Sequence, residues 1–348
     1  MRWQSQLVNV PAEERPDAGD SLRLGGLQAT VRTFDTPQFQ GITFYEVRAR
    51  SALNRVPEAS RMPFRWTVNP YRGCTHACVY CFARKTHTYL DLDAGRDFDT
   101  QVVVKVNVAE RLQAELAASR WRGEHVALGT NVDPYQRAEG RYRLMRGVLE
   151  AFRDAANPFS VLTKGTLILR DLDLLRQAAA VTDVSVNVSV GCVDESLWRS
   201  VEPGTPSPGR RLDVCRALDG AGVGCGVLMA PVLPYLSDTP EALERTVQGI
   251  AEAGATHVSP IVLHLRPGAR EWYMAWLARE HPSLVSRYER LYARGSYAPK
   301  AYQQEVAAAV TELAQRHGVG PRSAAQARRV RPERPAPRAP ETEQLTLL

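Results

Sequence analysis

Three cysteines, Cys74, Cys78 and Cys81, lie in one short stretch of the chain, separated by three and then two residues. Thiolates hold iron-sulfur clusters, and a 4Fe-4S cluster that only transfers electrons is normally held by four of them. No obvious fourth ligand accompanies this group, because the next cysteine along the chain is Cys192. The spacing therefore predicts a cluster that is held at three corners and keeps one iron for a small molecule.

Two other uses of clustered cysteines have to be weighed. A zinc site usually contains four Cys or His ligands in two separated pairs, and His76 and His87 lie close by. However, the chain has no second Cys-x2-Cys pair. A thioredoxin-type redox pair would use Cys78 and Cys81 but would not require Cys74. The cluster is therefore the favoured interpretation.

The composition is typical of a globular protein. The 348 residues are 44% hydrophobic, which is enough for a sizeable core. No apolar run approaches the length of a membrane span, and residues 1–5 lack the apolar core of a signal peptide. Six cysteines, three of them in one loop, fit a reducing compartment better than a disulfide framework. We therefore expect a cytoplasmic protein with no membrane segment.

The formal net charge of +6 permits contact with nucleic acid but is common in proteins that do not bind it. Half of this excess lies in residues 321–348, which contain six arginines and three glutamates. Residues 319–348 are rich in Pro and Arg and have almost nothing to bury. They are therefore predicted to form a disordered tail.

The pattern of apolar segments predicts an α/β fold. From residue 63 to residue 318, short apolar segments alternate with longer helical patterns, as in βα units around a parallel sheet. Residues 1–62 are predicted to form an N-terminal extension of turns and short strands, with no legible function. Strands are predicted near residues 65–69, 125–130, 159–164, 183–190, 223–230 and 257–265, helices include 141–155, 208–221 and 240–253, and 102–107 is a candidate inserted strand.

Polar residues at the ends of these strands are candidate ligand-binding residues, because active sites of βα barrels lie at the carboxyl ends of the strands. The second strand ends in a turn with Thr130, Asn131 and Asp133, although a plain Asn/Asp-Pro turn that caps a helix has the same pattern. The third strand ends at Lys164, one of only four lysines, which suits a point charge for a carboxylate.

The fourth strand alternates valines with polar residues, so Asn187 and Ser189 should face the barrel interior. Small polar residues also fill barrel interiors for packing alone, so both interpretations stay open. In the loop and helix that follow, Arg210 or Arg211 is a candidate for holding a carboxylate or phosphate, or else solvated charge at a helix start.

The wider pattern of motifs resembles the radical SAM superfamily. Within it, the chain is similar to the bacterial group related to spore photoproduct lyase and labelled DNA repair photolyase-like, in an actinobacterial branch. The resemblance covers approximately residues 36–318. The motifs that carry it include Asn-Pro-Tyr-Arg-Gly-Cys ending at Cys74, Cys-Phe-Ala-Arg ending at Arg84, Asp-Pro-Tyr-Gln beginning at Asp133, and Ala-Pro-Val-Leu-Pro-Tyr-Leu-Ser-Asp beginning at Ala230.

This resemblance implies a partial (β/α)6 TIM-like barrel and an enzyme, of lyase type in its nearest group, that uses a 4Fe-4S cluster and S-adenosyl-L-methionine (SAM). It implies reductive cleavage of SAM to a 5'-deoxyadenosyl radical, with a reductant such as flavodoxin or ferredoxin, and action on DNA. Two alternatives stay open: the same chemistry on a small molecule or protein, and a non-catalytic iron-sulfur protein that binds DNA.

The resemblance also assigns SAM-binding roles to the strand-end residues. In the family, the aromatic residue before the third cysteine packs near the adenine, the segment after the second strand contacts the methionine amino group, and strand four binds the ribose. The matching residues here are Tyr80 for adenine, Thr130, Asn131 and Asp133 for the amino group, Lys164 for the carboxylate, and Asn187 and Ser189 for the ribose.

The chain departs from the lyase pattern in two respects. Phe82 stands where the wider group usually has tyrosine, and no cysteine lies between Cys81 and Cys192, although the lyase has a hydrogen-donating cysteine after the second strand. Cys192, at the end of strand four, is therefore a candidate hydrogen donor, with a buried packing thiol as the alternative.

The last five residues, from Gln344 to Leu348, resemble the short peptide by which repair proteins dock on the bacterial sliding clamp. Such a peptide binds as an extended strand with its leucines in apolar pockets. A chance leucine-rich end is the alternative.

Overall fold

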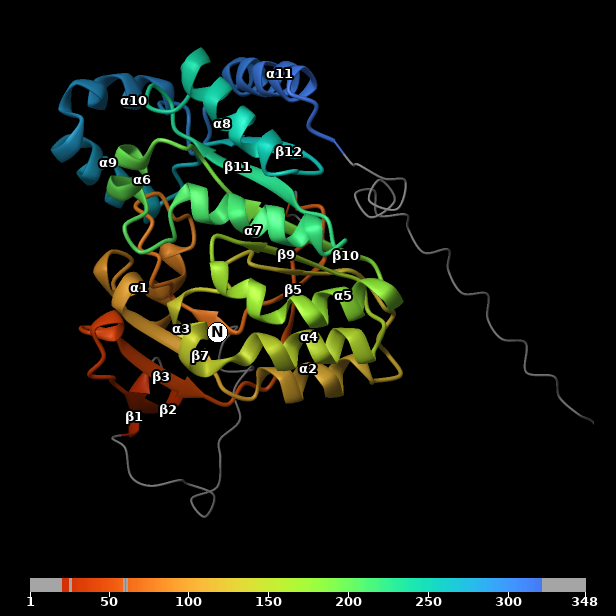
Figure 1. Cartoon of the computed structure of the whole chain (residues 1–348). Coiled ribbons are helices and arrows are strands. Elements are labelled where there is room, and N and C mark those ends of the chain that lie inside the picture. Colours follow the sequence, from red (N-terminus) through yellow and green to blue (C-terminus); the bar gives the residue numbers. More distant parts are fainter. Residues whose placement is uncertain (1–20, 25–26, 59, 61, 321–348) are drawn as a thin grey trace, which may run out of the picture.

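The computed structural model of the chain describes residues 21–24, 27–58, 60 and 62–320. Within these residues the strands form one sheet of seven strands and one of five. The larger sheet runs through the middle of the molecule with helices along its outer side, and the smaller sheet lies at the lower left of Figure 1. The two sheets together position the cysteine loop.

The seven-stranded sheet contains the six predicted strands. Its order is β12-β11-β10-β9-β8-β5-β4, with parallel pairing from β5 through β12 and antiparallel pairing between β4 and β5. Its two edges, β4 and β12, do not pair with each other in the described residues, so the sheet is an open partial barrel. The strands are β4 (Leu53–Arg55), β5 (Trp66–Val68), β8 (Val126–Leu128), β9 (Phe159–Thr163), β10 (Val184–Ser189), β11 (Gly226–Val232) and β12 (Val258–Val262).

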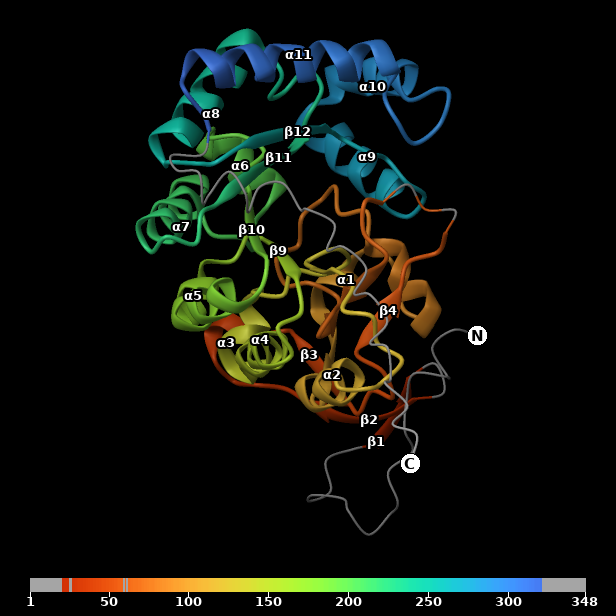
Figure 2. The ribbon, with the colours of Figure 1, turned by 90° about the vertical axis from the view of Figure 1, so that its right-hand side faces the viewer.

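Helices connect the strands and cover the outer face of the sheet, where α4, α5, α7 and α8 follow one another (Figure 2). α7 and α8 each begin with proline, and the hydroxyls of Ser207 and Thr239 accept bonds from the first turns, which is a strong helix-start signal. The connecting helices are α2 (Val108–Leu116), α3 (Arg137–Tyr142), α4 (Leu144–Asp154), η5 (Thr166–Asp171), α5 (Leu172–Val181), α6 (Glu195–Val201), α7 (Pro208–Gly220) and α8 (Pro240–Glu252).

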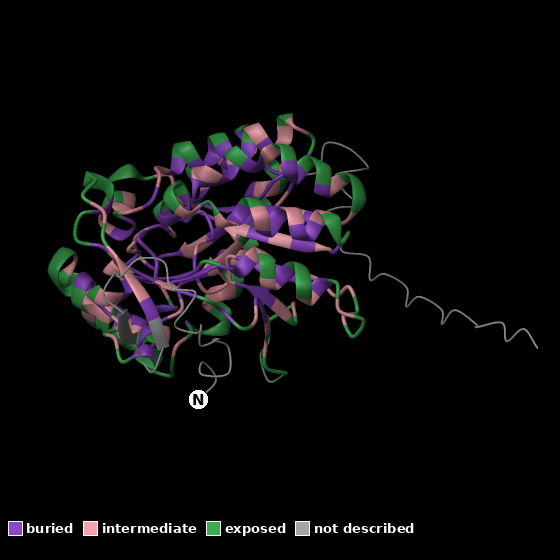
Figure 3. Ribbon diagram, turned by 90° about the horizontal axis from the view of Figure 1, so that it is seen from below, coloured by how far each residue is buried: buried purple, intermediate pink, exposed green. Residues whose placement is uncertain are grey.

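The main core lies between this sheet and its helices. Buried residues line the inner sides of the helices, while their outer sides are exposed (Figure 3). Phe152 of α4 stacks on Phe159 of β9 with ring centroids 4.9 Å apart. The predicted α/β class and parallel sheet are therefore confirmed. The apolar residues whose spacing predicted the strands and helices are the residues buried in this core.

The smaller sheet has the order β1-β2-β3-β7-β6 and includes the strand predicted at residues 102–107. That strand, β7, is not inserted in the main sheet, because it pairs with β3 and β6 instead. The elements of this region are β1 (Ser21–Leu24), β2 (Leu27–Arg32), η3 (Pro37–Phe39), β3 (Thr43–Val47), β6 (Tyr71–Arg72), η4 (Arg84–Leu90), α1 (Arg96–Thr100) and β7 (Gln101–Lys105).

The described part of the predicted extension, residues 1–62, is joined to both sheets. β3 pairs in parallel with β7, and β4 is part of the main sheet. The buried amide of Asn107 also accepts a bond from Ala49 N at 2.7 Å and donates to Ala49 O at 3.0 Å, as a strand partner would. The division of the chain at residue 62 stays a prediction, and the cross-pairing indicates that residues 27–58 fold together with the barrel.

The chain ends its described part with α9 (Ala269–Glu280), η6 (Pro282–Leu284), α10 (Val285–Leu291) and α11 (Lys300–Arg316). α11 packs on α8 and β12, and these elements share a second core that is rich in tyrosine. Among the described residues, no helix combines the length and apolar character needed to cross a membrane. The predicted tail lies almost entirely outside the described residues.

Candidate functional site

The three cysteines lie on one loop that leaves β6 and whose conformation is fixed by Gln136. The buried Gln136 amide accepts a bond from Thr75 N at 2.8 Å and donates to Gly73 O at 2.9 Å. Cys74 N also donates to Phe98 O at 2.9 Å. The first half of the loop is therefore held through its backbone. The side chains of Cys74, Cys78 and Cys81 form no disulfide.

Arg84 holds the second half of the loop. This fully buried side chain donates to Cys78 O at 2.9 Å and forms an ion pair with Asp99 at 2.9 Å. Its guanidinium carbon lies 5.2 Å from the ring centroid of Phe98 and 4.8 Å from that of Trp272. A planar cation between two rings and a carboxylate has little freedom, so Arg84 keeps the loop in one conformation.

The loop also docks on the end of α6 and on the segment that follows it. Val79 N donates to Val201 O at 3.0 Å, and Gly204 N donates to His76 O at 3.0 Å. A Cβ atom on Gly204 would lie 2.1 Å from Thr75 O, so the two backbones approach as closely as only glycine allows. The end of α6, the segment after it and the cysteine loop are thus joined backbone to backbone.

A buried carboxylate, Glu202, lies at the centre of this junction. It accepts hydrogen bonds from the Tyr80 hydroxyl and from Arg211, and its Oε1 lies 3.3 Å from Lys164 Nζ. Burial opposes the charge of Glu202, but the attraction of Arg211 and Lys164 outweighs burial and lowers its pKa to about 2. Glu202 is therefore ionised at neutral pH and paired with two cations.

The same cluster includes Ser189 at the end of β10. Lys164 Nζ donates to Ser189 Oγ at 2.5 Å and to Ala230 O at 3.3 Å, and it lies 5.8 Å from the centroid of the Tyr80 ring. Three of the sequence-predicted residues, Tyr80, Lys164 and Ser189, therefore meet in space. They come from the cysteine loop, the position directly after β9, and the end of β10.

Asp133 belongs to an adjacent group. Its carboxylate accepts bonds from Thr163 Oγ1 and Lys164 N, each at 2.6 Å, and lies 3.4 Å from His76 Nδ1. Burial disfavours its charge, but His76 and the hydrogen bonds lower the pKa of Asp133. Asp133 therefore ties the turn after β8 both to β9 and to the cysteine loop.

Thr130 and Asn131 are half-buried in the turn after β8, close to the group of Asp133. The turn can cross the end of β9 because of Gly129, where a Cβ atom would lie 1.8 Å from Leu162 O. Asn131 N donates to Asn69 Oδ1 at 3.3 Å, which connects the turn to the segment that leads to the cysteines. Thr130 and Asn131 therefore lie near the cysteine loop, as the sequence predicts for residues at the end of this strand.

Asn187 does not join the cluster around Glu202. Its side chain donates to Ser185 Oγ at 3.3 Å. A Cβ atom on Gly226 would lie 2.3 Å from Asn187 Oδ1 and 2.1 Å from the His257 ring. Asn187 thus packs one step further from the carboxyl end of β10 than Ser189, against the backbone of β11 and the ring of His257.

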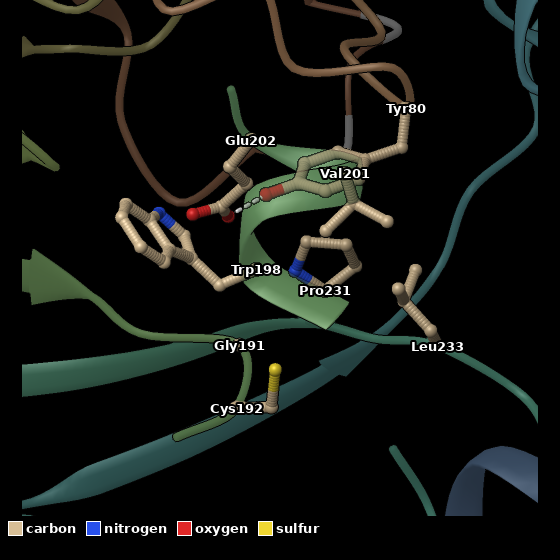
Figure 4. Close-up of a pocket in the computed structure, with 8 residues that line it drawn as sticks. All are labelled: Tyr80, Gly191, Cys192, Trp198, Val201, Glu202, Pro231 and Leu233. Carbon is tan, nitrogen blue, oxygen red and sulfur yellow. Dashed lines mark hydrogen bonds between the residues drawn. The ribbon is translucent and has the colours of Figure 1, made fainter. Parts of the chain in front are cut away.

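Cys192 lines a small pocket beneath the Tyr80 ring. Figure 4 shows its sulfur pointing toward Pro231, with the Tyr80 hydroxyl bonded to Glu202 on the far side. Burial, and next the charge of Glu202, raise the pKa of Cys192 to about 12, so it is a thiol at neutral pH. The residues that line the pocket are Tyr80, Gly191, Cys192, Trp198, Val201, Glu202, Pro231 and Leu233.

The donor set of the loop fits an iron-sulfur cluster. Cys74 and Cys78 are buried, Cys81 is partly exposed, and soft thiolates are the ligands that such clusters select. Burial raises the pKa of all three thiols, so bound iron has to supply the charge that stabilises the thiolates. Among the described residues, no three His, Cys, Asp or Glu side chains converge to hold a single metal ion, and a cube with each thiolate on a different iron does not require them to.

A family model described as the radical SAM superfamily matches residues 68–257, which span the cysteine loop and the strands up to the start of β12. The chain belongs to the radical SAM superfamily. The predicted cofactors, a 4Fe-4S cluster and SAM, follow from this membership. The chain is also 54% identical over 315 residues to an uncharacterized protein of Mycobacterium tuberculosis, covering 90% of this chain and 92% of the relative.

More distant relatives and solved structures extend the comparison. An uncharacterized protein of Methanocaldococcus jannaschii is 26% identical, covering 59% of this chain and 73% of the relative. Spore photoproduct lyase complexed with dinucleoside spore photoproduct is similar in structure, with a TM-score of 0.61, 15% identity and 80% of each chain covered. A variant of that lyase with bound AdoMet and the same dinucleoside has a TM-score of 0.59 at 15% identity, covering 76% of this chain and 77% of the lyase. The predicted resemblance to the lyase group is therefore confirmed as a shared fold.

Sequence reasoning missed several residues that hold the site together. Gln136 and Arg84 occur in the sequence only as parts of longer motifs, and no spacing pattern in the sequence indicates the central role of Glu202. Of the two candidates Arg210 and Arg211, Arg211 is buried and pairs with the carboxylate of Glu202, whereas Arg210 is exposed, as expected of solvated charge at a helix start. The sequence offered one signal, because a glutamate followed by Pro-Gly lies in the loop between α6 and α7, downstream of the carboxyl end of β10.

The close contact at Gly204 generates a prediction about cluster binding. Gly204→Ala should push the segment after α6 away from Thr75, lower the free energy of unfolding by about 1–3 kcal/mol, and reduce the iron bound after anaerobic reconstitution. Gly209→Ala is the matched control, because a Cβ atom there meets nothing within 4 Å. Thermal unfolding and iron analysis test both variants. Wild-type stability and iron content in Gly204→Ala would contradict the docking of the loop on this segment.

Proposed function

We propose that this protein is a cytoplasmic radical SAM enzyme that acts on nucleic acid, as a repair enzyme of the DNA repair photolyase-like group. Cys74, Cys78 and Cys81 would hold a cluster that, when reduced, would supply the electron for cleavage of SAM into methionine and a 5'-deoxyadenosyl radical, which would abstract a hydrogen atom from the substrate. The electron comes from a reductant such as flavodoxin or ferredoxin. The observation that carries the proposal is the rigid three-cysteine loop at the carboxyl end of a parallel sheet in a radical SAM chain.

The arrangement around Glu202 supports the proposed SAM-binding roles of Tyr80, Lys164 and Ser189. Glu202 carries one negative charge, while Lys164 and Arg211 carry two positive charges. The surplus positive charge on this buried cluster suits the carboxylate of the methionine part, with Lys164 as its counter-ion. Tyr80 would then lie against the adenine, and Ser189 would bind the ribose.

The other predicted SAM ligands have different support. Thr130 and Asn131 line the turn that Asp133 fixes to the cysteine loop, which suits contact with the methionine amino group. Both oxygens of Asp133 already accept hydrogen bonds within the protein, so we propose that Asp133 orients this turn. Asn187 remains proposed as a ribose ligand, although its contacts with Ser185 and Gly226 favour a packing role.

Action on nucleic acid is supported by the shared fold with a lyase whose structure holds a dinucleoside spore photoproduct. The net charge of +6 is consistent with a polyanionic substrate. The proposed clamp-binding end, from Gln344 to Leu348, lies outside the described residues. Its role stays a prediction, as does the alternative of a small-molecule or protein substrate.

The proposal is tested by assaying 5'-deoxyadenosine after anaerobic reconstitution, with SAM, a reductant and perdeuterated oligonucleotides, ultraviolet-irradiated or not. We expect 5'-deoxyadenosine that carries deuterium from the oligonucleotide, because the radical abstracts hydrogen from its substrate. Cys81→Ala should reduce the product to background, whereas Cys215→Ala, which removes a buried packing thiol of α7, should retain it.

The outcomes separate the candidate functions. Absence of 5'-deoxyadenosine from protein with an intact cluster would favour the non-catalytic iron-sulfur protein that binds DNA. Formation of 5'-deoxyadenosine without deuterium, and with unchanged oligonucleotides, would favour a small-molecule or protein substrate. Only deuterium transfer together with a changed oligonucleotide supports the function proposed here.

We also propose Cys192 as a hydrogen donor to the product radical. Its high pKa keeps the S–H bond intact at neutral pH, and the sulfur lines the pocket next to Tyr80. Donation of a hydrogen atom leaves a thiyl radical on Cys192, which regains one electron from the external reductant and one proton. Cys192 would then take the role of the hydrogen-donating cysteine that the lyase has after its second strand and that this chain lacks.

Cys192→Ala should leave SAM cleavage intact but change the product distribution, because the product radical loses its hydrogen source. Mass spectrometry of the treated oligonucleotide measures this distribution. Cys215→Ala, which also removes a buried thiol, should give the wild-type products. Unchanged products in Cys192→Ala would remove this role.

A further inference from the structure

Two half-exposed aromatic rings lie on the surface next to the third cysteine. Phe82, which directly follows Cys81, and Tyr297, in the loop between α10 and α11, are each 47% exposed. Most large apolar side chains of the described residues are buried, so two exposed rings near one site indicate a surface that binds a partner. Neither ring is used by the cofactor site described above.

Arg266 connects the two rings. Its guanidinium carbon lies 5.8 Å from the centroid of Phe82, and its Nη2 donates to the Tyr297 hydroxyl at 2.9 Å. The ring of His264 lies 4.5 Å from that of Tyr297, at an angle of 60°. The two segments are fixed by a β-bridge between His264 and Tyr297 and by a bond from Leu265 N to Ser296 O at 2.8 Å. Phe82, His264, Arg266 and Tyr297 therefore form one surface, here called the aromatic platform.

The charge of the platform and its rim suits an anionic partner. Arg266 and Lys85 are exposed, and Lys85 lies against Gly268, where a Cβ atom would meet Lys85 Cβ at 3.1 Å. A carboxylate next to Gly268, Glu271, accepts a bond from Gly268 N at 2.6 Å. Burial, and next the charge of Arg266, lower the pKa of His264, so its ring is neutral at neutral pH.

We propose that the aromatic platform stacks an unpaired nucleobase of a nucleic acid strand, with Arg266 and Lys85 on the neighbouring phosphates. This inference rests on the proposed function, and it adds that the nucleic acid substrate is unpaired where it contacts the platform. Aromatic rings stack with any base, and cations beside them bind the backbone, which is the chemistry of single-strand recognition. Because Phe82 follows Cys81 directly, the stacked base would lie beside the cluster loop.

The test measures binding of the reconstituted full-length protein to two fluorescent single strands with equal numbers of phosphates. One strand carries bases and the other consists of abasic residues. Tyr297→Leu and Phe82→Leu remove a ring each, Tyr297→Phe keeps the ring, and Tyr89→Leu removes an exposed ring of η4 outside the platform. Fluorescence anisotropy at several salt concentrations gives the affinities and their salt dependence.

We expect each Leu variant of the platform to bind the base-containing strand about 5- to 100-fold more weakly, since a stacked base contributes about 1–3 kcal/mol. Tyr297→Phe and Tyr89→Leu should bind like the wild type, and affinity for the abasic strand should not change. Arg266→Gln should reduce the slope of log affinity against log salt by about one, because one phosphate contact is lost.

Each contrary result has a distinct meaning. If the wild type binds nucleic acid but prefers neither strand, or if both Leu variants bind like the wild type, the platform is refuted while the proposed function stands. If the wild type binds neither strand, the platform is refuted, and the deuterium-transfer assay decides separately whether the protein acts on nucleic acid. If the Leu variants retain strand binding but accept electrons from flavodoxin more slowly, the surface docks a protein and the proposal is wrong.

Discussion

The buried negative charge of Glu202 is the constraint on which the arrangement of the site depends. A carboxylate without water has to be paired, and its partners Arg211, Lys164 and Tyr80 come from α7, the end of β9 and the cysteine loop. Removing one partner of such a buried group typically costs about 3–5 kcal/mol. The three segments are therefore coupled, because none can move without leaving a charge or a hydroxyl unsatisfied.

The electrostatics of the cysteine loop couple its thiolates to bound iron. Burial raises the pKa of Cys81 and so disfavours its thiolate, while Arg84, then the backbone N–H of Ala83 and last Lys164 act in the opposite direction. Arg84 is held between two rings, and Gln136 fixes the first half of the loop through its amide. The protein thus supplies a preformed loop and nearby positive charge, while the thiolates become stable only when iron binds and protons are released.

Much of this architecture was predictable because it depends on local patterns. Cysteine spacing indicated the cluster loop, and the period of two along β10 indicated that Ser189 faces inward. The same period placed Asn187 on the same face, but two residues along a strand span about 6–7 Å, so it reaches a different neighbourhood. The roles of Glu202, Gln136 and Arg84 depend on contacts with residues far along the chain or on stacking between rings, and no spacing rule encodes such contacts.

The central claim is that three thiolates hold a cluster whose fourth iron binds SAM. Mössbauer spectroscopy of the anaerobically reconstituted full-length protein, with and without SAM, tests this most directly. The account predicts about four iron atoms per chain, with one iron site whose spectrum alone changes when SAM is added. Iron-free protein with zinc at Cys74, Cys78 and Cys81, or a cluster whose four irons do not respond to SAM, would contradict it.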